Sequence, residues 1–451
     1  MEEAQQHRRA IWAWTMYDWA NSAFATTIMA AVLPVYYASV AAADLPPNEA
    51  TSNWAFTTTI ALVLVAVLGP ILGAMADFSG AKKRFLTTFA LMGILGTALL
   101  YFVQRGDWIM ASLFYILGSI GFSGANVFYD SLLPHVATPD EIDQVSSRGY
   151  AMGYAGGGIL LAINMAMILF GPKVLPSLLP GLALDQATLT TVMTRLAFVT
   201  VAVWWFSFTI PLWRFVPEPP RRILSNETGF NPIKASFTRL ASTFRNIRQY
   251  GELMKFIVAF WLYNNGIGTI IYMATIYGTE LGFGIETTVG TLLMVQFVAI
   301  PFAILFGWLA KKMGTKPAIL LSLAIYTAIA IGGYFLRTPL HFFLLGFAVA
   351  TVQGGSQALS RSLFGRMVPK SQSAEFYSFF GVSEKIAGTV GPLVFGIVSR
   401  LMGGSRFSII SLIIFFVLGM LLLTRVNEHE GIRVAEAEEQ TFLAQAPVPG
   451  A

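Results

Sequence analysis

The stretch Gly73-Ala-Met-Ala-Asp77-Phe-Ser-Gly80-Ala-Lys82-Lys83-Arg84 decides the fold, because it recurs in shortened form as Gly307-Trp-Leu-Ala-Lys311-Lys-Met-Gly314-Thr-Lys316. Each copy ends one long apolar run and precedes another. A polar turn with the same spacing of glycines and cations in both halves indicates that a membrane-spanning unit was duplicated. Asp77 in the first copy is replaced by Lys311 in the second, which indicates that the two halves no longer have identical roles.

The composition places the chain among polytopic membrane proteins. Of its 451 residues, 55% are hydrophobic and 12% are charged, whereas soluble domains carry about 25% charged residues. A helix needs roughly 20 apolar residues to cross the hydrocarbon core. Such runs occur at 11–41, 55–76, 85–104, 108–130, 149–171, 195–216, 254–277, 287–310, 317–336, 340–363, 376–399 and 406–425. Because lipid offers the backbone no hydrogen-bond partner, we expect an all-α protein with twelve transmembrane helices.

The distribution of Lys and Arg predicts how these helices are oriented. Most of the 29 Lys and Arg residues lie in segments on the side of the membrane that holds both termini, and cytoplasmic loops are the ones enriched in these residues. We therefore expect a multi-pass protein of the bacterial inner membrane (the cell membrane) with both termini in the cytoplasm. The net charge of +5 follows from this topology and requires no nucleic-acid partner.

The sequence argues against metal-dependent and enzymatic chemistry. The chain has no cysteine and only four histidines, and the histidines are not paired at the spacing of metal ligands. We therefore expect no metal site and no cofactor. No nucleophile–base pair or phosphate-binding loop is found either, so the chain is not expected to be an enzyme.

The apolar runs divide into two six-helix bundles, residues 1–216 and 254–425. Residues 217–253 form a charged cytoplasmic linker, either a solvated connection or an amphipathic helix near 232–250 that lies on an anionic leaflet. The tail, 426–451, is acidic and poor in aromatic residues, so we expect it to be disordered. Two six-helix halves with a central cytoplasmic loop are the architecture of major facilitator transporters, and we expect a monomer.

The turn 73–84 resembles the signature that this superfamily carries between its second and third helices, Gly-x-x-x-Asp-x-x-Gly-x-Lys/Arg. The resemblance implies that Asp77 lies near the start of a facing helix and holds the halves together on the cytoplasmic side, while Gly73 and Gly80 allow close backbone approach. Arg84 is included in this predicted gate, although the cations of the turn are interpreted mainly as topological anchors. Lys311 is expected to leave the second copy mainly an anchor as well.

A second pair of equivalent positions lies at the ends of the fourth and tenth spans. Asp130 in the first half corresponds to Arg361 in the second. If an axis along the membrane normal relates the repeats, these opposite charges face each other across the cytoplasmic mouth, either directly or through Arg148 and Glu375. The alternative is that charges at helix ends extend to water independently.

Several segments between residue 12 and about residue 400 share one further resemblance. They are Tyr17-Asp18-Trp19-Ala20-Asn21-Ser22-Ala23-Phe24, Tyr129-Asp130-Ser131-Leu132-Leu133-Pro134, Ser146-Ser147-Arg148-Gly149-Tyr150, Gly354-Gly355-Ser356-Gln357 and Glu375-Phe376-Tyr377. In them the chain resembles the vacuolar amino-acid effluxer-like branch of the major facilitators, also called the unknown major facilitator family. The resemblance implies secondary transport, with export of amino acids from the vacuole in the fungal members. Glu384 beside Lys385 departs from the family's pattern.

Polar side chains deep in the predicted spans are candidates for binding and coupling, because such groups are costly in lipid and normally face a cavity. Asp18 and Asn21 share one face of the first span, and Gln353 and Gln357 form a stripe that leads to Arg361. The other candidates are Asn264, Asn265, Gln296, Glu384 and Lys385. We expect Lys385 to hold a substrate carboxylate and Asp18 or Glu384 to carry a coupling proton. The alternatives are that the amides join helices and that the charges form an internal salt bridge.

The sequence therefore predicts transport of small polar solutes by alternating access, either proton-coupled or facilitative, with efflux of amino acids as the best interpretation. The partners would be a small-molecule substrate, protons and the lipid bilayer. One alternative is an exporter of drugs or hydrophobic metabolites, whose cavity would be dominated by aromatic residues and Met. The other is a non-transporting sensor or scaffold, which would not need charges at mid-membrane depth.

Overall fold

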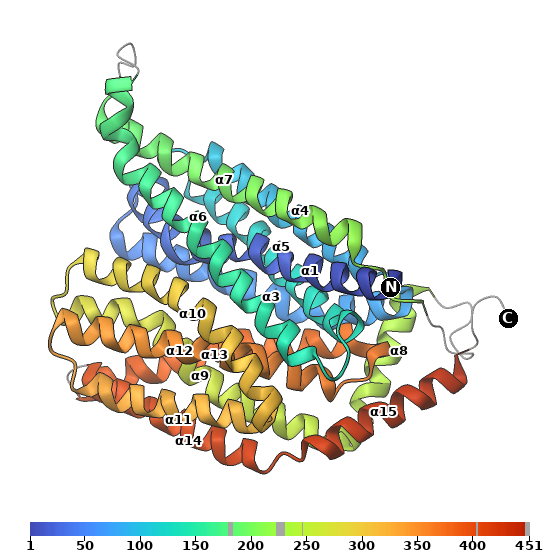
Figure 1. Ribbon diagram of the computed structural model, residues 1–451. Helices are drawn as coiled ribbons and strands as arrows, with labels where there is room; N and C mark the ends of the chain where they lie inside the picture. Colours follow the sequence, from blue (N-terminus) through green and yellow to red (C-terminus); the bar gives the residue numbers. More distant parts are fainter. Residues whose placement is uncertain (179–183, 222–230, 246, 403–404, 447–451) are drawn as a thin grey trace. The chain divides into compact units, whose positions relative to one another are not determined.

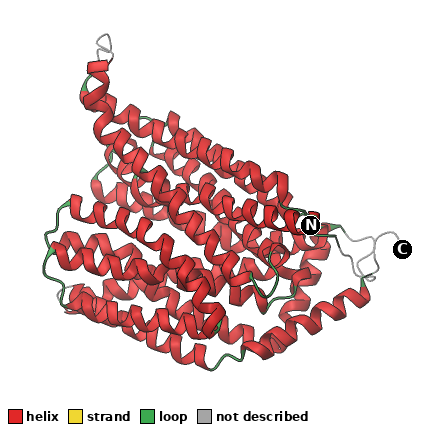
Figure 2. Ribbon diagram, viewed as in Figure 1, coloured by secondary structure: helices red, strands yellow, loops and turns green. Residues whose placement is uncertain are grey.

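The computed structural model describes residues 1–178, 184–221, 231–245, 247–402 and 405–446. Within these ranges the chain is almost entirely helical and contains no β-strand (Figure 2). The all-α class expected from the composition is confirmed. Its physical reason is that a chain in lipid must satisfy its backbone hydrogen bonds within each segment.

In the described part of the chain, 11 helical segments are long and apolar enough to cross a membrane. They are Glu2–Ala41, Pro47–Ser79, Lys82–Phe102, Trp108–Val136, Ile142–Ser177, Gln186–Phe215, Arg248–Ala274, Gly290–Met313, Thr315–Tyr334, Pro339–Arg366 and Arg406–Thr424. A further long helix, α13 (Ser373–Met402), contains the apolar portion Val390–Met402. It occupies the place of the eleventh predicted span, so each predicted span corresponds to a helix.

The helices of these spans are labelled in Figure 1. They are α1 (Glu2–Ala23), α3 (Pro47–Ser79), α4 (Lys82–Leu99), α5 (Trp108–Val136), α6 (Ile142–Leu178), α7 (Gln186–Phe215), α9 (Gly251–Glu280), α10 (Ile285–Met313), α11 (Thr315–Tyr334), α12 (Pro339–Arg366), α13 and α14 (Ser405–Thr424). Some begin at a capping side chain, as expected where the first N–H groups lack partners. Asp185 accepts hydrogen bonds from the backbone at the start of α7, and Thr338 does so at the start of α12.

The first span is interrupted by wider π-helical turns. After α1 come η1 (Phe24–Ala31), α2 (Leu33–Tyr36) and η2 (Tyr37–Ala41). The N–H of Val32 donates to the carbonyl of Thr27 at 2.8 Å, five residues back. Pro34 has no N–H to continue the regular ladder. π-helical turns are frequent at functional sites. Their position directly after Asp18 and Asn21 keeps these two residues among the candidates for a functional role.

Contacts between residues divide the chain into two units. The first contains Met1–Leu68, Lys83–Tyr129 and Met152–Pro217, and the second contains Gly69–Lys82, Asp130–Ala151 and the chain from Glu218 onward. The predicted bundles 1–216 and 254–425 thus differ from the contact units at one end of the first bundle. There, the parts of α3, α5 and α6 near the predicted cytoplasmic side belong with the second half, because of the polar contacts described below.

The first unit is held together by close helix packing. Helix α1 packs along α7, and Trp14 and Trp205 are fully buried. Where α4 and α5 cross, a Cβ added to Gly121 would lie 2.2 Å from the backbone nitrogen of Gly93. Only a small residue permits this approach of two helices, as is common within membranes.

The second unit contains an aromatic core that fixes the first part of α13. Helix α9 packs against α13 and α14, and α12 packs against α10 and α11 (Figure 1). The rings of Phe260 and Phe380 stack with centroids 4.3 Å apart, and Phe364 lies 4.6 Å from Phe380. Aromatic pairs of this kind bury large surfaces and prefer defined geometries. They therefore hold the start of α13 against α9 and α12.

The linker contains helix α8 (Pro232–Arg245), followed by the short helix η5 (Ile247–Tyr250). A helix near 232–250 was one of the two alternatives for this segment, and the structure contains one. Helix α8 buries Ala235 and Ser236, whereas Ile233 and Phe237 are 57% and 55% exposed. The helix thus packs on the protein through the face that carries Ala235, Ser236, Arg239 and Leu240, which are all buried.

The predicted disorder of the tail, 426–451, is corrected by helix α15 (Glu428–Gln445), while residues 447–451 lie outside the described ranges. The side chain of Asn427 caps this helix by accepting a hydrogen bond from the N–H of Glu430 at 3.2 Å. Ala435 and Phe442 lie seven residues apart on one helical face and are both buried. The acidic composition concealed this short apolar stripe. Hydrogen bonding from Arg433 also lowers the pKa of the Glu430 carboxyl.

Candidate functional site

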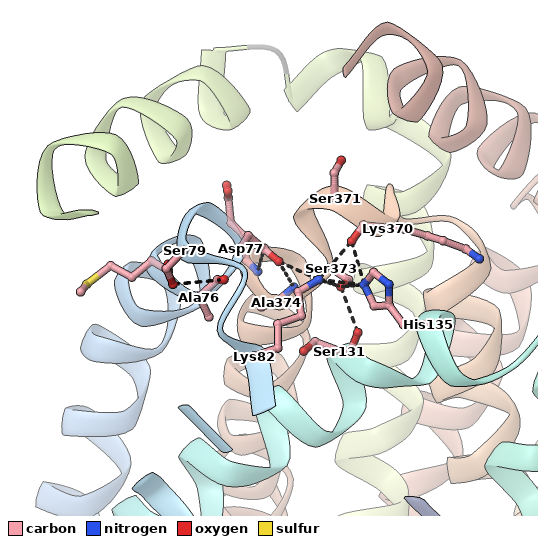
Figure 3. A network of polar contacts seen from close by, with 12 residues as sticks. Ala76, Asp77, Ser79, Lys82, Ser131, His135, Lys370, Ser371, Ser373 and Ala374 are labelled. Carbon is pink, nitrogen blue, oxygen red and sulfur yellow. Dashed lines mark hydrogen bonds and ion pairs between the residues drawn. The ribbon is translucent and has the colours of Figure 1, made fainter. Parts of the chain in front are cut away.

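Asp77 lies in the last turn of α3 and binds the start of α13, almost 300 residues away (Figure 3). Its oxygens accept hydrogen bonds from the backbone N–H groups of Ala374 at 3.2 Å and Glu375 at 2.8 Å. The first N–H groups of a helix lack partners within the helix and carry a partial positive charge. Asp77 therefore caps α13 from a distant part of the chain, and it is only 6% exposed.

Two glycines make this approach possible. A Cβ on Gly73 would lie 2.5 Å from the carbonyl oxygen of Ala374, and one on Gly80 would lie 2.6 Å from the Cα of Arg221. Gly80 also has a φ of 59°, a left-handed conformation that glycine adopts without strain. The spacing of Gly73, Asp77 and Gly80 thus sets both the contact and the turn that follows it.

Lys82 is the buried cation of this cluster. Its Nζ lies 2.9 Å from Asp77 Oδ1 and donates to Ser373 Oγ at 2.6 Å and to the Lys370 carbonyl at 3.1 Å. The same Nζ lies 2.9 Å from His135 Nε2, and Lys82 is 3% exposed. A charge buried this deeply needs several partners, and Lys82 has them from four helical segments.

The position of Lys82 changes the expectation for the cations of the turn. Arg84 was assigned to the gate on sequence grounds, but the structure leaves its side chain exposed. Lys82, interpreted as an anchor, lies inside the cluster instead. The spacing itself held the signal, because Lys82 is the cation at the last position of the Gly-x-x-x-Asp-x-x-Gly-x-Lys pattern.

Asp130 and Arg361 form a direct ion pair, with Arg361 Nη1 3.0 Å from Asp130 Oδ1. Arg361 also donates to the side chain and the carbonyl of Ser146, each at 2.9 Å. Its guanidinium lies 4.4 Å from the centre of the Tyr150 ring. Arg361 is 3% exposed, so the end of α12 is fixed against α5 and α6 by a buried charge whose partners are protein groups.

The other two predicted gate residues occupy different surroundings. Glu375 is fully buried next to the N–H contact of Asp77, and Asp77, Thr243 and Arg239 are its polar neighbours. Arg148, in contrast, is exposed on α6. The bridge between Asp130 and Arg361 therefore needs neither Arg148 nor Glu375.

A further ion pair, between Asp143 and Arg366, was missed from the sequence. Asp143, in the first turn of α6, lies 2.6 Å from Arg366 Nη2 and accepts hydrogen bonds from Ser362 at 2.5 Å and Thr315 at 2.8 Å. Asp143 is 5% exposed. Its signal was weak, because an acidic residue in the first turn of a helix is ordinary.

Asp18 and Asn21 both contact α5 within the first unit. The hydroxyl of Tyr129 donates to Asp18 Oδ2 at 2.7 Å, and the Asn21 amide is hydrogen-bonded to Asn126. Asp18 is partly exposed and Asn21 is 2% exposed. The pair expected on one helical face thus lies on one interface, that between α1 and α5.

Asn264 and Asn265 are both buried in α9. The Asn265 oxygen accepts a hydrogen bond from the N–H of Gly391 at 2.8 Å, and its nitrogen donates to the carbonyl of Trp261 at 2.7 Å. An amide engaged on both sides joins α9 to α13. This geometry favours the alternative role for Asn265, that of holding helices together.

Gln296 and Gln353 line one cavity of about 130 Å³ among the helices of the second half. Most of its other lining residues are apolar, among them Met273, Leu292 and Phe342. Gln357 and Glu384 are partly buried. The side chain of Lys385 lies outside the described residues.

A family model described as "Vacuole effluxer Atg22 like" matches residues 46–436. The chain belongs to this family. Within the Atg22-like family, the uncharacterized MFS-type transporter YxiO of Bacillus subtilis is 38% identical over 432 residues, which cover 96% of this chain and 98% of that protein. Autophagy-related protein 22 of Coccidioides immitis is 25% identical over 449 residues, covering 85% of this chain and 74% of the relative.

Solved structures show the fold of this Atg22-like chain. The proton:xylose symporter XylE matches with a TM-score of 0.70 and 15% identity, covering 96% of this chain and 99% of the symporter. The transporter FucP, in an outward conformation, matches with a TM-score of 0.67 and 13% identity, covering 94% and 99%. The chain therefore has the major facilitator fold, as predicted.

Membership of the Atg22-like family makes the chain a secondary transporter and a multi-pass membrane protein rather than an enzyme. The resemblance seen in the sequence is thus confirmed at the level of the family. The buried polar clusters around Asp77 and Arg361 join helices that are far apart in the sequence.

Proposed function

We propose that this transporter exports amino acids by alternating access in exchange for protons, as a monomer in the bacterial inner membrane with both termini in the cytoplasm. The observation that carries the mechanism is the capping of α13 by Asp77. The family description as an effluxer supports the direction, and the buried or partly buried polar side chains of the spans support a polar substrate.

The contacts of Asp77 and Arg361 would act as a cytoplasmic gate. Asp77, Lys82 and the N–H groups of α13 form one contact, and Asp130 with Arg361 forms the other. The desolvation of buried charges offsets much of their mutual attraction. Water that enters during opening therefore replaces the lost contacts. The gate can thus have a defined closed geometry and still open reversibly.

Asp18 is our candidate for the coupling proton, with Glu384 as the other. A carboxylate that accepts a hydrogen bond from Tyr129 loses part of that interaction when protonated, so proton binding would change the contact between α1 and α5. We assign the substrate carboxylate to Lys385, and place the polar remainder of the solute near Gln296, Gln353 and Gln357.

The cavity lined by Gln296 and Gln353 favours a second candidate, an exporter of hydrophobic metabolites or drugs. Apart from these amides and a few Thr and Tyr hydroxyls, its wall is apolar. An apolar cavity of about 150 Å³ is large enough to bind benzene, and this one encloses about 130 Å³. A solute with an apolar group of that size would fit it.

Counterflow in liposomes distinguishes the two candidates. Purified protein would be tested with amino acids, sugars, peptides and hydrophobic drugs at two pH gradients. Exchange of amino acids that rises with the pH gradient supports the first proposal, and exchange of apolar solutes alone supports the second. Absence of exchange for every solute would instead support a sensor or scaffold.

Lys385→Ala tests the substrate site in the same assay. We expect at least a tenfold loss of amino-acid exchange, because a carboxylate in a low-dielectric cavity depends on its counter-charge. Lys311→Ala is the matched control, since Lys311 is an exposed lysine of the second half. Equal exchange by Lys385→Ala and the parent protein would remove Lys385 from the site.

A further inference from the structure

The linker contacts the turn 77–82 through the ring of Phe78. Phe78 is 1% exposed, and the guanidinium carbons of Arg221 and Arg239 each lie 5.4 Å from its centroid. Guanidinium groups are attracted to aromatic faces, and more strongly where both are removed from water. Phe78 follows Asp77 directly, so these contacts act on the residue next to the cap of α13.

Arg239 also contacts the tail. Its guanidinium carbon lies 5.5 Å from the centroid of Phe442 in α15. Arg239 is 6% exposed, although it belongs to a linker helix. One arginine of α8 therefore touches both the end of α3 and α15, which are far apart in the sequence.

The charge of Arg239 acts on Glu375. Glu375 is fully buried, and the charged groups that influence it are Asp77 and Arg239. Asp77 is paired with Lys82, and of the two charged groups that influence Glu375 it is Arg239 that carries a positive charge. Burial of a carboxylate is costly without such a counter-charge.

The segments around Arg239 enclose the start of α13 from several sides. The backbone of Arg221 leaves no room for a side chain at Gly80. From α15, the Glu439 carboxylate accepts a hydrogen bond from the N–H of Ser371 at 2.8 Å, just before α13. Figure 3 shows Asp77 and Lys82 beside Ser371, Ser373 and Ala374 in this region.

We propose that Arg239 is a positioning residue of the cytoplasmic gate. It holds the turn 77–82 against the start of α13 through the Phe78 ring and the charge of Glu375. The inference rests on the proposed role of Asp77 in gating, and it makes the linker a working part of the gate. Opening then requires α8 to release Phe78.

A single cysteine reports the state of this gate. The chain has no cysteine, and Ser147 is 1% exposed beside Ser146, which binds Arg361. In full-length protein carrying Ser147→Cys, the rate of alkylation by a membrane-impermeant maleimide added to inside-out vesicles measures opening toward the cytoplasm.

Arg239→Gln is expected to raise that rate about tenfold, the equivalent of about 1.4 kcal/mol and within the range of a desolvated cation–π contact. Arg239→Lys keeps the cation and is expected to stay within about twofold of the parent. Arg245→Gln is the matched control, because Arg245 is exposed on the same helix, and it should label at the parent rate.

A double variant and Asp77→Asn separate the role of Arg239 from that of the gate. Arg239→Gln combined with Glu375→Gln removes both charges and should return the rate to within about threefold of the parent. A parent-like rate in Arg239→Gln with faster labelling in Asp77→Asn overturns the role of Arg239 and leaves the gate standing. Parent-like rates in both variants overturn the gate as well.

Two outcomes would show that Arg239 contributes packing alone, and the proposal then fails. In the first, Arg239→Lys and the double variant are labelled as fast as Arg239→Gln. In the second, thermal melting shows that Arg239→Gln is unfolded and that Arg239→Lys does not restore the fold.

Discussion

Gly73 in the first copy of the turn and Gly307 in the second each bring a helix of one half against the start of a helix of the other. A Cβ on Gly73 would meet the Ala374 carbonyl at 2.5 Å, and one on Gly307 would meet the Ser147 side chain at 2.8 Å. The two copies of the turn thus have an equivalent packing role.

The charges of the two turns differ. In the first copy, the carboxylate of Asp77 lies on the turn and binds the start of α13. In the second, Lys311 is exposed and Thr315 donates to Asp143 at the start of α6. In the first contact the carboxylate therefore lies on the turn, and in the second it lies on the facing helix. The second turn is more than the topological anchor expected from Lys311, because Thr315 binds a carboxylate across the contact.

Asp77→Asn and Thr315→Val test this difference, and Asp77→Asn has the largest expected effect. It leaves Lys82 buried without its anion, a loss of about 3–5 kcal/mol that would speed labelling of Ser147→Cys by about 100-fold or more. Thr315→Val removes one hydrogen bond, while Arg366 and Ser362 still bind Asp143. We expect about tenfold or less, from about 1 kcal/mol.

The control for these two variants is Asp140→Asn, since Asp140 is an exposed acidic residue of the same side. It should leave the labelling rate unchanged. If Asp77→Asn and Thr315→Val accelerate the labelling of Ser147→Cys equally, both turns stabilise the closed state to the same extent. The proposed difference between the turns would then be wrong.

Gly73→Ala and Gly307→Ala sharpen the packing side of the comparison. The neighbour of Gly73 is backbone, which cannot move aside, so overpacking should cost about 1–3 kcal/mol and lower the thermal midpoint. The neighbour of Gly307 is the Ser147 side chain, so a smaller loss is expected. Ser147→Gly should restore Gly307→Ala. If it does not, the contact at Gly307 is not the one that limits stability.

Lys83→Met and Lys316→Met should have the smallest effects, and similar ones. Lys83 donates to the carbonyl of Val216 at 2.8 Å just after α7, and Lys316 donates to that of Val426 at 2.8 Å just after α14. Cations at helix C-termini contribute about 0.3–1 kcal/mol, or a fall in thermal midpoint of about 1–3 °C. Faster labelling of Ser147→Cys in either variant would show that these lysines also serve the gate.

Much of the candidate site could be predicted from the sequence, because equivalent positions in two similar halves are expected at equivalent places in the structure. The matching positions of Asp130 and Arg361 predicted that opposite charges would face each other, and the structure has them 3.0 Å apart. The pattern around Asp77 indicated a facing helix. It did not show which cation is buried, since Lys82, Lys83 and Arg84 are chemically alike and two residues of helix rotate a side chain by more than half a turn.

The linker and the tail show why composition fails for surface helices. The tail is acidic, yet Phe442 is buried in α15, and Arg239 of the charged linker is buried between aromatic rings. Both depend on partners far away in the sequence. Composition averages over a segment and does not register one side chain that meets a distant ring.

The sequence by itself determined the membrane class and the helical spans, because the energy of burying backbone in lipid acts on each segment separately, and its motifs identified the family. Only the tertiary structure decided which charges meet: Lys82 rather than Arg84 with Asp77, Asp143 with Arg366, and Arg239 with Phe78. Those pairings depend on the rotation and depth of whole helices. They are set by packing between elements rather than by any local pattern.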